Sequence, residues 1–226
     1  MSPFITADAV GEAETNQTLQ WNETLPPAVE RCIHHLVEER AQQQPDAEAL
    51  CSAAGSLTYK ALNASATTVA KRLLALGVQT DTYVALSFEH SIWAVVAMLG
   101  VLKAGAAFAS IPPSPSQRIE TILGQMNPTA ILASPLRASS LMQYPQPKIV
   151  VSAEDLGQLE ALDDSHLAVN VKPGNLAYAV FTSGSTGTPK VSFCVSDSKK
   201  LAKADVLDVG CPNRAPATLH LRDPMG

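Results

Sequence analysis

The sequence predicts an α/β fold with a doubly wound, largely parallel β-sheet. Three observations carry this prediction. Short continuous apolar runs are typical of strands that are buried on both faces, and the segments between them have helical apolar periodicity. The chain has 226 residues, of which 46% are hydrophobic and 16% charged, enough to bury a sizeable core. The buried strands are predicted at residues 83–88, 106–111, 129–134, 148–152 and 176–181.

Two helices are predicted in the first third of the chain. The first spans residues 28–41, where apolar residues recur at helical spacing, and it ends before Pro45. The second spans residues 62–77 and ends at Gly77, a residue that suits a C-terminal cap. The short strands predicted between them are residues 48–52 and 57–59.

The middle of the chain alternates strands and helices. Ser91 is expected to cap a largely buried helix from Ile92 to Ala104, with Gly105 at its end. A further helix is predicted over residues 117–126. Because each helix separates two apolar strands, we expect helices on both faces of the sheet.

Charge and composition exclude several classes of protein. The formal net charge is −5 without a long basic run, so nucleic-acid and membrane partners are not expected. The longest apolar run, residues 92–102, is shorter than the roughly 20 residues that span a bilayer. The N-terminus lacks the features of a secretory signal, and the four cysteines lie too far apart for a zinc motif. We therefore expect a cytoplasmic protein with free thiols and no metal site.

Isolated polar candidates are interpreted as structural. His34, His35 and His90 lack partners at a useful spacing, which favours solvated or hydrogen-bonded side chains. Glu160 and Asp163-Asp164 lie in a polar stretch typical of a solvated turn. Trp93 stands among aliphatic residues and is expected in the core.

A loop of small and hydroxylated residues follows the last predicted strand. Residues 181–190 read FTSGSTGTPK, and in open α/β sheets ligands bind beyond the carboxyl ends of the strands. Gly184 and Gly187 let backbone N–H groups converge on an anion. The hydroxyl groups and the Lys190 ammonium add donors and positive charge. The loop therefore predicts a polyphosphate-binding site.

Other interpretations of this loop are weaker. A Walker A loop has Gly before its Lys and Ser or Thr after it, whereas Pro189 and Val191 flank Lys190 here. A flexible Ser/Gly/Thr linker remains as an alternative, but the strand before the loop and the Pro-Lys pair after it favour the phosphate site. Ser183 lacks the G-x-S-x-G context of a nucleophile, and no catalytic residue is identified.

Four stretches carry a resemblance to a known family. LAYAVFTSGSTGTPK resembles the phosphate loop of the adenylate-forming superfamily, and within it the adenylation domains of nonribosomal peptide synthetases. LTYKALN and VLKAGAAFASIPPSPSQRI resemble the first and second core motifs of those domains. WNETLPPAVERCIHHLVEERAQQQPDAEAL resembles the junction between a condensation and an adenylation domain in fungal synthetases. The resemblance covers residues 20–190, the opening part of an N-terminal subdomain.

The resemblance implies ATP-dependent activation of an amino or aryl acid as an acyl adenylate, with Mg²⁺ present. The acyl group then passes to a phosphopantetheine carrier protein in secondary-metabolite biosynthesis. The parent enzyme is a ligase, and the loop would bind the β- and γ-phosphates or pyrophosphate. The residues that match this role are Thr182, Ser183, Gly184, Ser185, Thr186, Gly187 and Lys190.

Departures from the family pattern suggest an incomplete domain. Ser110 and Pro112 stand where the family usually has a proline and an aspartate, and Val191 replaces the glycine expected after Lys190. The family's acyl-, adenine- and ribose-binding residues lie further downstream and are not located here, so the chain's own enzymatic activity stays open. The predicted organisation is a flexible lead-in at 1–19, a partial adenylation domain at 20–190 and an unrelated, disordered tail at 191–226.

Alternative origins lead to different expectations. The chain is either a truncated, inactive adenylation domain, or a non-catalytic remnant or assembly partner produced by a frameshift or an unspliced intron. A fragment of an acyl-CoA ligase is a further alternative. In each case the sheet is expected to end with an exposed edge at residues 176–181, which predicts marginal stability and association.

Overall fold

The computed structural model describes residues 31–52, 55–112, 116–157, 167, 169–182 and 190–195. Over these residues the predicted α/β fold is confirmed. Its main sheet is built from β3 (Tyr83–Ser87), β4 (Ala107–Ser110), β5 (Ala130–Ala133), β6 (Lys148–Val150), β7 (Leu176–Thr182) and β8 (Lys190–Val195). The strand order is β6-β5-β3-β4-β7-β8. The first five of these are parallel, and β8 runs antiparallel to β7.

The longer helices lie where the apolar periodicity predicts them, with small shifts at their ends. They are α2 (Ile33–Gln43), α3 (Tyr59–Ala75), α4 (Ile92–Lys103) and α5 (Ser116–Met126). An antiparallel hairpin of β1 (Glu48–Ser52) and β2 (Gly55–Thr58) precedes α3. Three short elements were not foreseen: α6 (Pro135–Ala138), the 3-10 turn η2 (Ser139–Leu141) and α7 (Ala153–Gly157).

Two helix starts differ from the prediction. Helix α2 begins at Ile33, because the Cys32 backbone is extended, with φ −70° and ψ 144°, whereas residues 28–30 of the predicted helix lie outside the described residues. Helix α3 begins at Tyr59, within the stretch predicted as a strand. The Ala61 N–H donates to Thr58 Oγ1 at 3.2 Å, so Thr58 caps α3 and ends β2.

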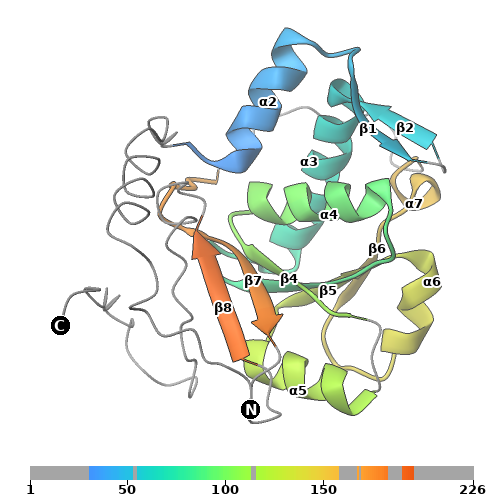
Figure 1. The fold of residues 1–226 in the computed structure, drawn as a ribbon, viewed down its shortest axis with the longest axis vertical. Helices are drawn as coiled ribbons and strands as arrows, with labels where there is room; N and C mark the ends of the chain where they lie inside the picture. The colour runs from blue at the N-terminus through green and yellow to red at the C-terminus, as the bar shows by residue number, and fades with distance from the viewer. Residues whose placement is uncertain are drawn as a thin grey trace, which may run out of the picture.

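The sheet is covered on both faces, as the sequence predicts. Figure 1 shows α4, with α3 beside it, on one face and α5 on the other. Side chains alternate between these layers: Val84 and Leu86 pack with the α3 and α4 layer, whereas Ala85 packs with the α5 layer. Trp93, expected in the core, is partly buried against the first layer. Of the described helices, none has the length and apolar character needed to cross a bilayer.

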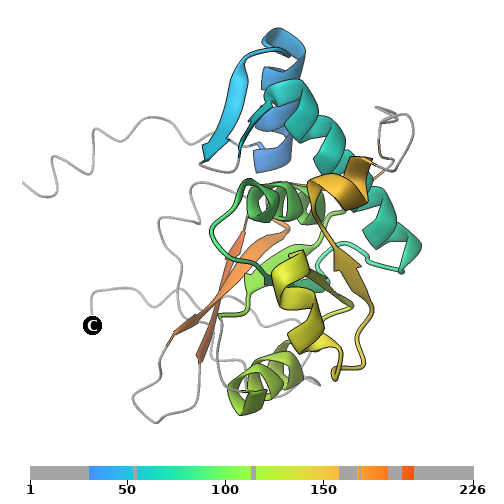
Figure 2. The ribbon, with the colours of Figure 1, turned by 90° about the vertical axis from the view of Figure 1, so that its right-hand side faces the viewer.

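The end of the sheet corrects one expectation. Strand β7 is not an exposed edge, because β8 pairs with it from Leu176↔Val195 to Thr182↔Lys190 and forms the outer strand (Figure 2). The alternating apolar residues Val191, Phe193 and Val195 are a strand pattern that the sequence analysis assigned to a disordered tail. Residues 1–19 and 196–226 lie outside the described residues, so disorder there stays a prediction.

Candidate phosphate-binding site at the end of β7

The predicted loop lies between the two strands at one end of the sheet. Thr182 is the last residue of β7, Lys190 is the first of β8, and their backbones are paired in the antiparallel register. The structure therefore places these two predicted site residues opposite each other. The other five, Ser183, Gly184, Ser185, Thr186 and Gly187, lie outside the described residues.

The position of this turn suits a ligand site. Helix α4 follows β3 and α5 follows β4, and these helices cover opposite faces of the sheet. The carboxyl ends of β3 and β4 are therefore a topological switch point, where open α/β sheets bind their ligands. Strand β7 is parallel to β4 through the pairs Phe108↔Tyr178 and Ala109↔Ala179. Thr182 thus emerges at the same edge of the sheet, one strand from the switch point.

A hydrogen-bonded pair that the sequence analysis missed lies at this edge. Ser134, which follows β5, donates through Oγ to Glu89 Oε2 at 2.7 Å, and its N–H donates to Ser87 O at 3.1 Å. Glu89 follows β3, so the pair joins the carboxyl ends of two neighbouring strands. Both residues stand at the ends of apolar runs, and this position in the sequence could have indicated that they lie at the carboxyl edge of the sheet. The pair ties together the segments that follow β3 and β5, next to the switch point.

Ser91 only partly fulfils its predicted role. It is the residue before α4, but its side chain makes no capping hydrogen bond, and its Oγ is buried without a hydrogen-bond partner. His90 beside it is exposed, in agreement with a solvated side chain. Glu160 and Asp163-Asp164 lie outside the described residues.

The start of β7 is held by Asp81, whose role the sequence did not reveal. Asp81 Oδ1 accepts from the Leu176 N–H at 2.8 Å, and Oδ2 accepts from Asn175 Nδ2 at 2.9 Å. The Asp81 N–H donates to Gly105 O at 3.1 Å. Asp81 has φ 62°, in the left-handed region. This carboxylate fixes β7 beside β4 and so helps to set where the candidate phosphate loop begins.

We expect Asp81→Gly to lower the free energy of unfolding by about 2 kcal/mol, because two hydrogen bonds worth about 1 kcal/mol each are lost while the positive φ is kept. Asp81→Asn keeps the acceptor for Leu176 and tolerates positive φ, so it should have roughly half that effect. Urea unfolding of the three proteins measures this order. Variants as stable as the wild type would show that Asp81 does not anchor β7.

The comparisons with known proteins agree with the predicted family. The chain matches the family described as AMP-binding enzyme over residues 37–192. It is 41% identical to nonribosomal peptide synthetase TES of Alternaria alternata over 178 residues, which are 78% of this chain and 3% of that protein. It is 44% identical to nonribosomal peptide synthetase 9 of Aspergillus fumigatus over 181 residues, 78% of this chain and 16% of that protein. The chain therefore spans a small part of these relatives.

Solved structures support the fold. Superposition on the crystal structure of VinN gives a TM-score of 0.67 at 21% sequence identity. The aligned part covers 77% of this chain and 46% of VinN. The nonribosomal peptide synthetase FmoA3, in a form bound to α-methyl-L-serine-AMP, gives a TM-score of 0.66 at 24% identity and covers 79% of this chain and 20% of that one. The family match spans more than half of the sequence and includes both motif-like stretches and the segment from Thr182 to Lys190. The chain therefore belongs to the family of AMP-binding enzymes.

Proposed function

We propose that this chain binds the β- and γ-phosphates of ATP, or pyrophosphate, through the loop from Thr182 to Lys190. The observation that carries the proposal is the pairing of Thr182 with Lys190 at the carboxyl edge of the sheet, beside the switch point. That pairing brings the two ends of the seven-residue segment 183–189 together, and we expect successive N–H groups of this segment to converge on an anion. The family match includes this loop.

The parent chemistry of the family suggests the wider role. An adenylation domain activates an amino or aryl acid as an acyl adenylate with ATP and Mg²⁺, and passes it to a carrier protein. Mg²⁺ would supply charge neutralisation on the triphosphate. Thr182, Ser183, Ser185, Thr186 and Lys190 would donate to phosphate oxygens, and Gly184 and Gly187 would let them approach the backbone. We further propose that the chain acts in the cytoplasm, with synthetase domains or a carrier protein as partners.

We expect binding to be weak and sensitive to salt. A single lysine on a hydrated surface contributes about 1 kcal/mol to a charge at 4 Å, and salt screens this attraction. Lys190→Ala should therefore weaken ATP and pyrophosphate affinity by roughly fivefold. Lys172→Ala is the matched control. Lys172 is an exposed lysine that precedes the first residue of β7, so it lies at the end of the strand away from the loop. Isothermal titration at low salt measures both variants.

The outcomes separate a specific site from general charge attraction. Equal weakening by Lys190→Ala and Lys172→Ala would contradict the proposal, and so would an affinity that Lys190→Ala leaves unchanged.

Catalysis is tested separately by exchange of pyrophosphate into ATP with Mg²⁺ and panels of amino, aryl and fatty acids. We expect no acid-dependent exchange by the 226-residue chain, because none of the stretches that resemble the family carries its adenosine- or acid-binding motifs. Exchange by the wild type that is lost in Lys190→Ala would overturn the inactive assignment. The acid that supports such exchange would distinguish a synthetase-type activity from that of an acyl-CoA ligase.

A further inference from the structure

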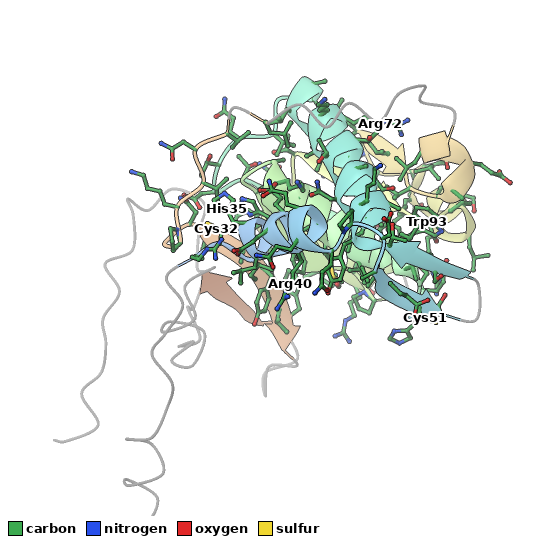
Figure 3. All side chains as sticks on the ribbon, turned by 90° about the horizontal axis from the view of Figure 1, so that it is seen from above. Cys32, His35, Arg40, Cys51, Arg72 and Trp93 are labelled. Atoms are coloured by element: carbon green, nitrogen blue, oxygen red, sulfur yellow. The ribbon has the colours of Figure 1, made fainter. Side chains whose placement is uncertain are left out.

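The first turn of α2 brings together three side chains that the phosphate site does not use. Cys32, His34 and His35 each offer one ligand atom, and these atoms all lie within 4.8 Å of one another. Cys32 is the residue before the helix, and the two histidines are its second and third residues. Figure 3 shows Cys32 and His35 close together at one end of α2, whereas Cys51 lies away from them on the β1–β2 hairpin.

The spacing of the three ligand atoms is near that of a metal site. Tetrahedral zinc, with Zn–S and Zn–N bonds of about 2.3 and 2.0 Å, separates its ligand atoms by about 3.5 Å. The present atoms therefore need to approach by at most about 1.3 Å. His35 is the least buried of the three, so rotation of its side chain can supply this movement without disturbing the core.

Burial affects two of the ligands in opposite ways. Cys32 is 1% exposed and His34 is 4% exposed. Burial, with a smaller contribution from His35, lowers the pKa of His34 to about 4, so its imidazole is neutral and has a free lone pair at neutral pH. Burial raises the pKa of the Cys32 thiol, and its Sγ donates to Val171 O at 3.6 Å. A bound cation reverses this preference, because a coordinating thiol loses its proton.

Nearby charges are balanced. The positive charge of Lys103 acts on the cluster, because it lowers the pKa of His34. The negative charge of Glu38 opposes that shift. Lys103 forms an ion pair with Glu38. The positive charge of Lys103 is therefore compensated locally and does not by itself exclude a cation from the cluster.

We propose that Cys32, His34 and His35 form a binding site for Zn²⁺. One thiolate and two imidazoles are ligands that zinc prefers, and the fourth position is left to solvent on the side of His35. Binding replaces the thiol proton with a Zn–S bond and releases one proton to water. This proposal goes beyond the phosphate site and is independent of it.

The test uses Co²⁺ as a spectroscopic probe in place of Zn²⁺, on the whole 226-residue chain without a histidine tag. We expect one Co²⁺ per chain, with a thiolate-to-cobalt charge-transfer band and the visible bands of a tetrahedral ion, both displaced by Zn²⁺. Cys32→Ser should abolish the charge-transfer band. His35→Ala should weaken binding by at least about tenfold, since loss of even an outer-shell partner has that effect. Cys51→Ser and His90→Ala are matched controls that should leave both bands unchanged.

Several results would overturn the proposal. They are the absence of a charge-transfer band at stoichiometric Co²⁺, a band that survives Cys32→Ser, and a loss that is as large in Cys51→Ser. Cys194 and Cys211 are present in all these variants, so a surviving band would assign the thiolate to them. Circular dichroism checks that each variant folds. If Cys32→Ser does not fold, the Co²⁺ affinity of His35→Ala is the deciding measurement, and an unchanged affinity would overturn the proposal. ATP affinity should be the same in all these variants, which separates this site from the phosphate loop.

Discussion

Replacing Glu38 with alanine is expected to lower the free energy of unfolding by about 3 kcal/mol. Glu38 lies on α2 and forms an ion pair with Lys103 at the end of α4. The Lys103 side chain is only 3% exposed, whereas that of Glu38 is 25% exposed. Removing the carboxylate leaves a buried ammonium without its counter-charge, and that desolvated charge is what makes the change costly.

A matched pair of variants separates this cause from loss of packing. Lys103→Met removes the buried charge but keeps a side chain of similar length, and it leaves Glu38 with partial access to water. We expect it to cost less than about 1.5 kcal/mol. Adding Lys103→Met to Glu38→Ala should then recover most of the lost stability. Urea unfolding of the three variants measures this, and a double variant no more stable than Glu38→Ala would contradict the explanation.

Gly100→Ala is expected to destabilise the chain by about 3 kcal/mol, at the upper end of the usual cost of overpacking. A Cβ atom at Gly100 would lie 2.6 Å from Val69 Cγ1, 2.7 Å from Val69 Cβ and 3.0 Å from Ala66 O. Val69 lies on α3 and is fully buried where α3 packs against α4, and Ala66 O is backbone. Neither can withdraw, so α3 and α4 would have to move apart. This cost exceeds the gain of about 1 kcal/mol that alanine brings to a helix.

Gly124→Ala is the control for helix propensity. Gly124 also lies inside a helix, α5, but a Cβ atom there would meet nothing within 4 Å. We expect this variant to be more stable than the wild type by up to about 1 kcal/mol. Thermal and urea unfolding compare the two substitutions directly. If both glycine variants shifted stability in the same direction, the close approach of α3 and α4 would not explain the requirement at Gly100.

Much of the sheet could be predicted from local pattern. Strands such as β3 and β5 are buried on both faces, so each appears in the sequence as a continuous apolar run with helical segments on either side. The ends of elements were less predictable. The start of α3 depends on the hydrogen bond from Ala61 to Thr58, and the start of α2 depends on the extended backbone of Cys32.

Strand β8 shows a different limit. Its apolar alternation at Val191, Phe193 and Val195 was visible, but the change from the family pattern after Lys190 favoured a disordered tail. A strand of six residues gains its stability from the neighbour with which it pairs, and that neighbour is not encoded in its own residues. Pairing with β7 therefore decided the outcome.

The sequence by itself determined the fold class and the family and predicted a phosphate loop, because each of these is expressed in residues that are consecutive along the chain. Tertiary structure alone decided the contacts between distant residues. It placed Asp81 against Leu176, Glu38 against Lys103, and the backbones of Thr182 and Lys190 opposite each other. It also buried Cys32 and His34, whose surroundings include Val171 and Lys103 from other segments. The physical reason is that an apolar pattern records how deeply a residue is buried, whereas a polar group's partner and charge environment depend on which segments pack around it.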